Sequence, residues 1–173
     1  MKFDNVIFDF DGTLADTSPG VLGSVRYALE TLGAPVPDEN VLRGFIGPSL
    51  YSSFTGIIGF DGKKADEAIA LYRSVYNPRG VYECKLYDGM KDLLIKIKAA
   101  GVSASVASSK PQNALDKVVD FLGVREYFDR VVGADPDDKH DDKALIVAAA
   151  RTRDNAVMIG DSRFDIEAAK KSE

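Results

Sequence analysis

The sequence predicts an α/β protein built on a doubly wound parallel sheet, with a small helical domain inserted after the first strand. Three observations lead to this prediction. Apolar runs alternate with amphipathic helical segments after about residue 86, a long helical stretch follows the first apolar run, and polar residues close three of the runs. Strands that alternate with helices favour a parallel sheet with helices on its faces.

The first apolar run covers residues 6–8 and ends in acidic residues, as is typical of a buried parallel strand. Apolar residues then recur at helical spacing from residue 18 until Gly33, and a further helix is predicted over residues 61–76. Between residues 17 and 85 we find helix signals and no convincing strand. We therefore expect a helical cap domain over 17–85.

Helix and strand signals alternate through the rest of the chain, which forms the predicted core domain together with residues 1–16. Helices are predicted over 90–101, 111–122 and 145–150 and from residue 164 onward, and strands over 102–107, 130–133 and 156–159. Ligands of such sheets bind at the carboxyl ends of the strands, so we expect the functional site there.

Composition narrows the classes of partner. The 173 residues carry 22 Lys and Arg against 27 Asp and Glu, giving a net charge of −5. This acidic balance argues against a nucleic acid or an anionic membrane as the main partner. Cys84 is the single cysteine, which excludes an intramolecular disulfide and fits a reducing compartment. The N-terminus has no apolar signal-peptide core and the longest apolar stretch is too short to span a bilayer, so we expect a cytoplasmic protein.

Polar residues follow three of the predicted strands, over residues 9–13, 108–110 and 160–165. Carboxylates gathered at one point repel each other unless a cation lies among them. Oxygen ligands without a cluster of His or Cys favour Mg²⁺ over zinc. One carboxylate can then attack phosphorus while its neighbour moves protons, with Ser108 donating a hydrogen bond to the phosphoryl group. A lysine such as Lys143 would neutralise charge on the nucleophile and the phosphate.

These residues carry a resemblance to a known family. Residues 9–14, Asp-Phe-Asp-Gly-Thr-Leu, resemble the first motif of the haloacid dehalogenase superfamily, in its phosphatase branch. Ser108 falls at the second motif, Lys143 at the third and residues 160–165 at the fourth, so the resemblance covers essentially the whole chain. Residues 43–48 and 86–89 are similar to cap and hinge segments of phosphoglycolate-phosphatase-like members.

The resemblance implies a Rossmann-like core that hydrolyses a small phosphorylated metabolite through an aspartyl-phosphate. It makes Asp9 the nucleophile and Asp11 the general acid and base. Mg²⁺ would bind the Asp9 carboxylate, the Asp11 backbone carbonyl and Asp161, with Asp165 assisting directly or through water. Further residues assigned to substrate binding are Gly12, Thr13, Ser109 and Arg43. We expect a monomer or a weak homodimer.

Two other functions stay open. Asp11 argues against a dehalogenase or a phosphonate hydrolase, because those members of the superfamily lack a carboxylate at this position. A sugar-phosphate mutase of the same superfamily stays possible. The argument against it is Gly160, since such mutases usually have Glu at that position. A non-enzymatic phospho-acceptor module of the receiver type also combines acidic residues, a hydroxyl and a lysine. The long helical insertion argues against that module.

Several of these residues also have a purely structural interpretation. Asp9 and Asp11 would then form a strand-end turn, and Asp161 and Asp165 would cap the last helix. Ser108 and Ser109 would cap the helix that follows Pro111, which is compatible with phosphate binding. Arg43 would form a surface ion pair.

The sequence differs from the usual pattern of the family after the fourth motif. Relatives usually continue beyond the fourth motif with further strand–helix units, whereas this sequence ends at residue 173 within a predicted helix. We therefore expect the usual C-terminal strands to be missing, one flank of the sheet to be uncovered, and the stability to be lower than that of a complete relative.

The third motif yields a first test, because Lys139 lies close to Lys143 in the sequence. We favour Lys143 because apolar residues follow it in a helix, as they follow the lysine of the family. Lys143→Ala should abolish phosphatase activity and Lys139→Ala should retain it, measured with an aryl phosphate; the reverse result would reassign the motif.

Overall fold

The computed structural model describes residues 3–135 and 142–172. The chain divides into two compact units. One, the sheet unit, comprises Met1–Asp16 and Lys85–Glu173; the other, the helical unit, comprises Thr17–Cys84. The second boundary lies one residue before the boundary predicted at residue 86.

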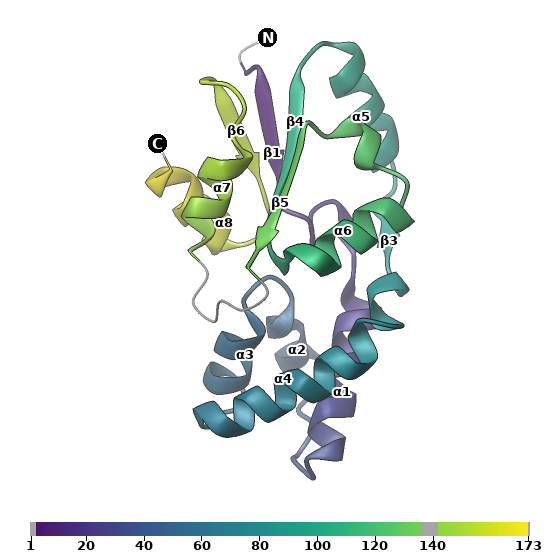
Figure 1. The fold of residues 1–173 in the computed structure, drawn as a ribbon, viewed down its shortest axis with the longest axis vertical. Coiled ribbons are helices and arrows are strands. Elements are labelled where there is room, and N and C mark those ends of the chain that lie inside the picture. The colour runs from purple at the N-terminus through teal and green to yellow at the C-terminus, as the bar shows by residue number, and fades with distance from the viewer. Residues whose placement is uncertain (1–2, 136–141, 173) are drawn as a thin grey trace. The chain divides into compact units, whose positions relative to one another are not determined.

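A four-stranded parallel sheet forms the centre of the sheet unit (Figure 1). Its strands are β1 (Asn5–Phe8), β4 (Ser103–Pro111), β5 (Arg130–Ala134) and β6 (Ala156–Ile159), in the order β5-β4-β1-β6. β1 lies inside the sheet, where Asn5 pairs with Ser103 of β4 and with Ala156 of β6. The predicted α/β fold with a parallel sheet is therefore confirmed.

Helices cover both faces of this sheet. They are α5 (Met90–Ala99), α6 (Gln112–Phe121), α7 (Lys143–Ala150) and α8 (Arg163–Lys171), and a 3₁₀ turn, η3, covers Arg125–Tyr127. Figure 1 shows α5 and α6 on one side of the sheet and α7 and α8 on the other. Ile7, Ala107 and Val147 are buried in the core between the sheet and this second pair of helices. The chain places β4 and β5 on one side of β1 and then β6 on its other side, which is the doubly wound arrangement. Ligands of such sheets bind where this direction reverses, here at the carboxyl ends of β1 and β6.

The helical unit consists of α1 (Ser18–Thr31), α2 (Glu39–Leu42), α3 (Leu50–Gly56) and α4 (Gly62–Tyr76), with the 3₁₀ turns η1 (Arg43–Phe45) and η2 (Gly80–Tyr82). α1 packs against α4, and Val25, Ala28 and Leu29 of α1 are fully buried at the helical spacing that the sequence shows. The helix predicted over residues 61–76 begins one residue later, because Asp61 is its N-cap and accepts a hydrogen bond from Lys64 N.

Two short strands were not predicted. β2 (Ala15–Asp16) and β3 (Lys85–Leu86) pair antiparallel, with Asp16 opposite Lys85. The prediction that residues 17–85 contain no strand is therefore wrong at Lys85. Two residues are too few to show the alternation that marks a strand in a sequence. The pair joins the two segments at which the chain leaves and re-enters the sheet unit.

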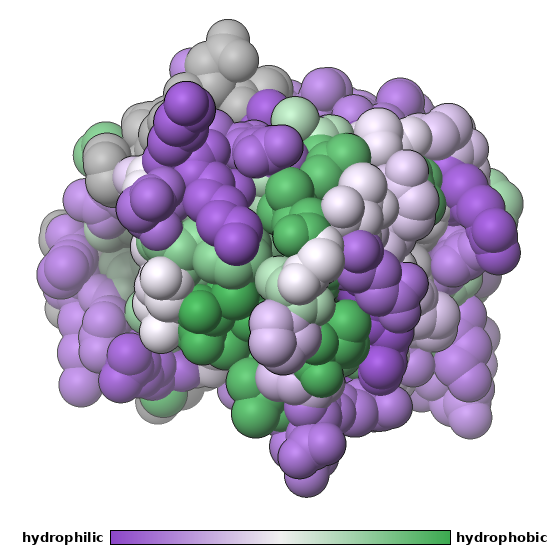
Figure 2. All heavy atoms as spheres, turned by 90° about the horizontal axis from the view of Figure 1, so that it is seen from below, coloured by the Kyte–Doolittle hydropathy of each residue, from purple (hydrophilic) through white to green (hydrophobic). Residues whose placement is uncertain are grey.

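Figure 2 shows hydrophobic residues gathered near the centre of one face and hydrophilic residues around them. Within residues 3–135 and 142–172, no helix combines the length and the apolar composition that crossing a membrane requires.

Close backbone contact joins α1 to η2 within the helical unit. A Cβ atom added to Gly20 would overlap the carbonyl oxygen of Gly80. Ser24 lies one turn later, where its Oγ donates to the Gly20 carbonyl oxygen at 2.8 Å. Only a residue without a side chain allows the two backbones to approach this closely, so Gly20 sets the packing of the unit.

Gly20→Ala should therefore lower the free energy of unfolding by about 2 kcal/mol or more, because the new methyl group forces the backbones apart. Gly23, in the same helix, is exposed, and a Cβ atom added to it would have no neighbouring atom within 4 Å. Gly23→Ala should raise the free energy of unfolding by about 0.5–1 kcal/mol. Urea unfolding of both variants tests this difference, and equal effects would contradict the packing argument.

Candidate active site

Asp9 lies at the carboxyl end of β1, near the centre of the sheet. Its backbone N–H donates to the Ile159 carbonyl oxygen at 2.9 Å, which continues the pairing of β1 with β6. The side chain is 2% exposed. Oδ1 lies 3.1 Å from Lys143 Nζ, whereas no described residue offers Oδ2 a hydrogen bond. A buried carboxylate oxygen without a partner is unusual, and it leaves a position that a ligand, an ion or a water molecule can fill.

Asp165 has two roles at the start of α8. Its Oδ2 accepts hydrogen bonds from the backbone N and the Oγ of Ser162, at 2.9 and 2.7 Å, in a capping box. Its Oδ1 lies 2.5 Å from Lys143 Nζ. The structural interpretation is therefore correct for Asp165, which caps the helix, but capping occupies only one of its two oxygens. The other faces the centre of the site.

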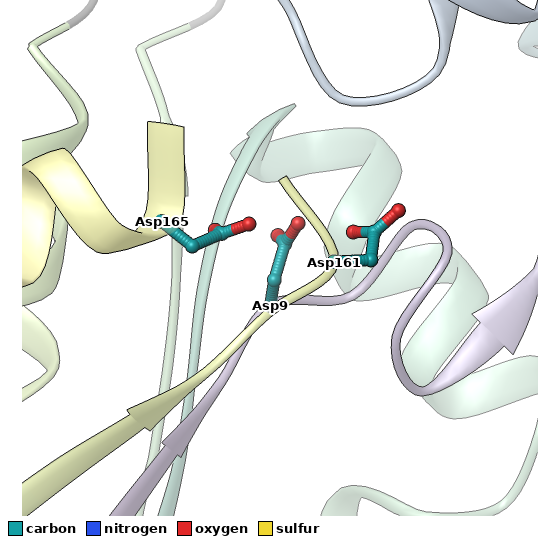
Figure 3. A group of neighbouring side chains, drawn as sticks. All are labelled: Asp9, Asp161 and Asp165. Atoms are coloured by element: carbon teal, nitrogen blue, oxygen red, sulfur yellow. The ribbon is translucent and has the colours of Figure 1, made fainter. Parts of the chain in front are cut away.

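Asp161 lies on the opposite side of Asp9 from Asp165 (Figure 3). It is exposed, and its Oδ1 accepts a hydrogen bond from Thr13 Oγ1 at 3.3 Å. Gly12 adopts φ +82°, and a Cβ atom on it would overlap Asp161 Oδ2. Gly12 and Thr13 therefore contact the Asp161 carboxylate, and the turn after β1 depends on a glycine at this point.

Gly160 is required by its contact with Asp165. A Cβ atom at residue 160 would overlap the Asp165 carboxyl group. A Glu at residue 160, as sugar-phosphate mutases usually have, would therefore require the Asp165 carboxyl group to move.

The three carboxylates Asp9, Asp161 and Asp165 suit a divalent cation. One oxygen from each lies within 4.8 Å of the others. With all groups ionised, these three and Asp11 carry four negative charges against two positive charges on Lys110 and Lys143, so two negative charges remain. Together with the bare Asp9 Oδ2, this all-oxygen set fits a hard ion such as Mg²⁺.

Lys143 occupies the first turn of α7, which Asp142 caps by accepting a hydrogen bond from Ala144 N at 3.0 Å. Its ammonium group lies between Asp9 and Asp165, and the side chain is 9% exposed. The competing candidate, Lys139, lies outside the described residues.

Ser108 and Ser109 lie near the carboxyl end of β4, which extends four residues beyond the predicted strand to Pro111. Its pairing with β5 shifts register between Ala107 and Pro111. Ser108 is 1% exposed, and its Oγ accepts a hydrogen bond from Lys110 N at 3.2 Å. Neither serine caps α6, whose N-cap is Pro111 and which has no side-chain cap. The proposed capping role of these serines is wrong.

Lys110 is the residue of this site to which the sequence analysis gave no role. Its Nζ lies 3.2 Å from Asp11 Oδ2, and both side chains are buried. The Ser-Ser-Lys sequence after a predicted strand was a visible signal. A lysine at a strand end is usually solvated, however, and nothing in the local sequence indicates that this one pairs with Asp11.

Burial and the ion pairs act in opposite directions on the pKa values of the cluster. Desolvation raises the pKa of Asp9 to about 7, against the opposing effect of Lys143 and with additional repulsion from Asp165 and Asp11. Burial acts to lower the pKa of Lys143, but Asp9 and Asp165 outweigh it and the net shift is upward. For Asp165, desolvation is likewise outweighed, by Lys143 and Ser162, and the pKa is lowered. Of these two carboxylates, Asp9 is therefore the one whose negative charge is less compensated.

Most of the predicted site residues lie at the end of the sheet where the parallel strands have their carboxyl ends. Asp9, Asp11, Gly12, Thr13, Ser108, Lys143, Asp161 and Asp165 all lie at or next to the carboxyl ends of β1, β4 and β6 or at the starts of α7 and α8. Arg43 belongs to the helical unit, where it is exposed and pairs with Glu39 at 3.0 Å. The surface ion pair considered for Arg43 is therefore present.

The sequence of this chain is similar to those of known proteins. The family described as "Haloacid dehalogenase-like hydrolase" matches residues 6–173. A tyrosine-protein kinase, PtkA, of Mycobacterium tuberculosis is 34% identical over 169 aligned residues, which cover 95% of this chain and 57% of the relative. A 5'-nucleotidase of Pseudomonas aeruginosa is 32% identical, with 99% of this chain and 80% of the relative covered.

Solved structures of phosphatases are also similar to this chain. A structure described as a predicted phosphatase from Clostridium acetobutylicum superposes with a TM-score of 0.92 at 35% identity and covers 98% of this chain and 81% of its own. The chain thus spans only 57% of the PtkA relative, but about four-fifths of the nucleotidase and of this phosphatase.

The pKa of Asp9 yields a pH prediction. Because the folded chain binds this proton more tightly than the unfolded chain, the resulting stability is complete below about pH 3.8 and is lost as the pH rises through about 7. In EDTA, the free energy of unfolding of the wild type should fall relative to Asp9→Asn between about pH 5 and pH 8, as measured by urea unfolding. Mg²⁺ should raise the Tm of the wild type more at about pH 8 than at pH 5.5. Parallel pH curves for the two proteins would contradict the assignment.

Proposed function

Because the chain belongs to the haloacid dehalogenase-like hydrolase family, we propose that it hydrolyses a small phosphate monoester through a phosphorylated Asp9. The observation that carries the proposal is the buried Asp9 carboxylate at the end of β1, with one oxygen paired to Lys143 and the other without a partner. Relatives named 5'-nucleotidase, pyrophosphatase and phosphoglycolate phosphatase support the hydrolase class.

In the first step, an Asp9 carboxylate oxygen attacks the phosphorus atom as the bond to the leaving oxygen breaks. The leaving oxygen takes its proton from Asp11, and the alcohol departs. Asp9 needs its charge for this attack, and the ammonium of Lys143 lies close enough to stabilise that charge and the charge developing on phosphate. Ser108 would donate a hydrogen bond to a phosphoryl oxygen.

In the second step, a water molecule attacks the phosphorus of the aspartyl-phosphate. Asp11, now ionised, takes a proton from the water as the bond between phosphorus and the Asp9 oxygen breaks. Inorganic phosphate leaves, and both carboxyl groups return to their starting states. Splitting hydrolysis in this way replaces one difficult step by two easier ones.

We propose Mg²⁺ as the cofactor, held by Asp9, the Asp11 backbone carbonyl and Asp161, with Asp165 assisting directly or through water. When bound, it would neutralise the excess negative charge of the cluster and bind a phosphate oxygen. Asp161 is held by Thr13 and borders Gly12, so the residues assigned to substrate binding in this turn also orient a metal ligand.

For the substrate, we propose a small phosphorylated metabolite, with a phosphoglycolate-like acid as the first compound to test. Relatives from Pseudomonas aeruginosa and Pseudomonas putida carry the name phosphoglycolate phosphatase. Residues 17–85 would act as a cap that shields the reaction from water, and Arg43 and Ser109 would contact the substrate.

Two alternatives give different products. A sugar-phosphate mutase would convert a hexose phosphate into its isomer without net release of phosphate. A phospho-acceptor module would accumulate a long-lived aspartyl-phosphate and release phosphate only slowly. Incubation with labelled sugar phosphate and with acetyl phosphate separates both from a hydrolase.

Asp9→Asn should reduce hydrolysis of 4-nitrophenyl phosphate by at least about 10³-fold, because the amide is a poor nucleophile. The matched control is Asp154→Asn, at an exposed carboxylate outside the cluster, which should keep the wild-type rate. EDTA should abolish wild-type turnover and Mg²⁺ should restore it. Full activity of Asp9→Asn would disprove the nucleophile assignment, and full activity in EDTA would disprove the cofactor.

A further inference from the structure

A second buried lysine, Lys110, lies near the carboxyl end of β4, beside Asp11. Lys110 Nζ is 3.2 Å from Asp11 Oδ2, and the two side chains are 5% and 9% exposed. Lysines are seldom buried this completely unless they are paired. The four sequence motifs account for Lys143 but not for Lys110, so the pairing with Asp11 needs an explanation of its own.

The backbone of Lys110 is fixed on two sides. Its N–H donates to Ser108 Oγ at 3.2 Å, and its carbonyl oxygen lies so close to β5 that a Cβ atom on Gly133 would be only 2.7 Å away. The register of β4 against β5 shifts at this segment, between Ala107 and Pro111. Bulges of this kind redirect side chains next to functional sites. The backbone of Lys110, from which the side chain reaches Asp11, is therefore held in place by the central sheet.

The two lysines serve different carboxylates. Lys143 pairs with Asp9 and Asp165, whereas Lys110 pairs with Asp11. A general acid must lie within hydrogen-bond reach of the atom that it protonates, and a misplacement of about 1 Å can cost about 10²-fold in rate. Fixing the Asp11 carboxylate is therefore a separate requirement from activating Asp9.

We propose that Lys110 is a positioning residue, which holds the Asp11 carboxyl group where it protonates the leaving oxygen. The inference rests on the proposed function and deepens it. Lys110 neither donates nor accepts a proton. The proton passes from Asp11 to the leaving oxygen, and Asp11 regains a proton from water in the second step. The effect of Lys110 on the reaction is exerted through Asp11.

Esters that differ in their need for a proton test this role. The nitrophenolate of 4-nitrophenyl phosphate leaves without protonation, whereas the alkoxide of an alkyl phosphate such as phosphoglycolate requires it. Lys110→Met should lower kcat/KM by about 10²-fold for the alkyl ester and much less for the aryl ester. A merely structural role would lower both values in the same proportion.

A double-mutant comparison tests whether Lys110 acts through Asp11. Asp11→Asn should itself affect the alkyl ester more than the aryl ester, and adding Lys110→Met should change kcat/KM little further. Lys117→Met removes an exposed lysine from α6 and should leave both esters at wild-type rates. If Lys110→Met folds poorly in a thermal melt, Lys110→Gln removes the charge while keeping a hydrogen-bond donor and should show the same selective loss in weaker form.

The possible results separate this inference from the proposed function. A wild-type protein that hydrolyses neither ester overturns the proposed function and the role of Lys110 with it. If the wild type is active, three results overturn the role of Lys110 alone: equal losses for both esters, losses that multiply in the double variant, or faster turnover of the alkyl ester.

Discussion

The ion pairs of Lys143 with Asp9 and Asp165 are the interaction on which the arrangement of the site depends. Two carboxylates from β1 and α8 are buried close together, and the ammonium at the start of α7 keeps them from repelling each other. Burying charges is costly unless they are paired and hydrogen-bonded. The compensation is incomplete, since Asp9 keeps one bare oxygen and a pKa raised to about 7. That remaining negative charge is what makes the cluster suited to a cation.

Local structure and chemistry share the same residues around this pair. Asp165 completes the cap of α8 with one oxygen and meets Lys143 with the other. Gly12 and Gly160 leave room for Asp161 and Asp165, so the turns that end β1 and β6 can bring both carboxylates next to Asp9. The structural and functional interpretations of these positions are therefore not alternatives, because the cap and the close turns are what orient the carboxylates.

Much of the fold and the site could be predicted because their signals are local. The apolar periodicity of α1 and the run over residues 6–8 predicted a helix and a strand, and both are present. Polar residues after three strands predicted a meeting point because parallel strands end at one edge of a sheet. The antiparallel pairing of Asp16 with Lys85 could not be predicted, since two residues carry no periodicity.

By itself, the sequence determined the order along the chain of the longer strands and helices and the residue types that follow the strands, because both can be read from local patterns of polarity. Only the tertiary structure decided which charges face each other. Lys110, which lies within the register shift of β4, pairs with Asp11, and Lys143 at the start of α7 lies between Asp9 and Asp165. These pairings join residues far apart in the chain, and they form because a buried charge must find its partner wherever the packed elements bring one within reach.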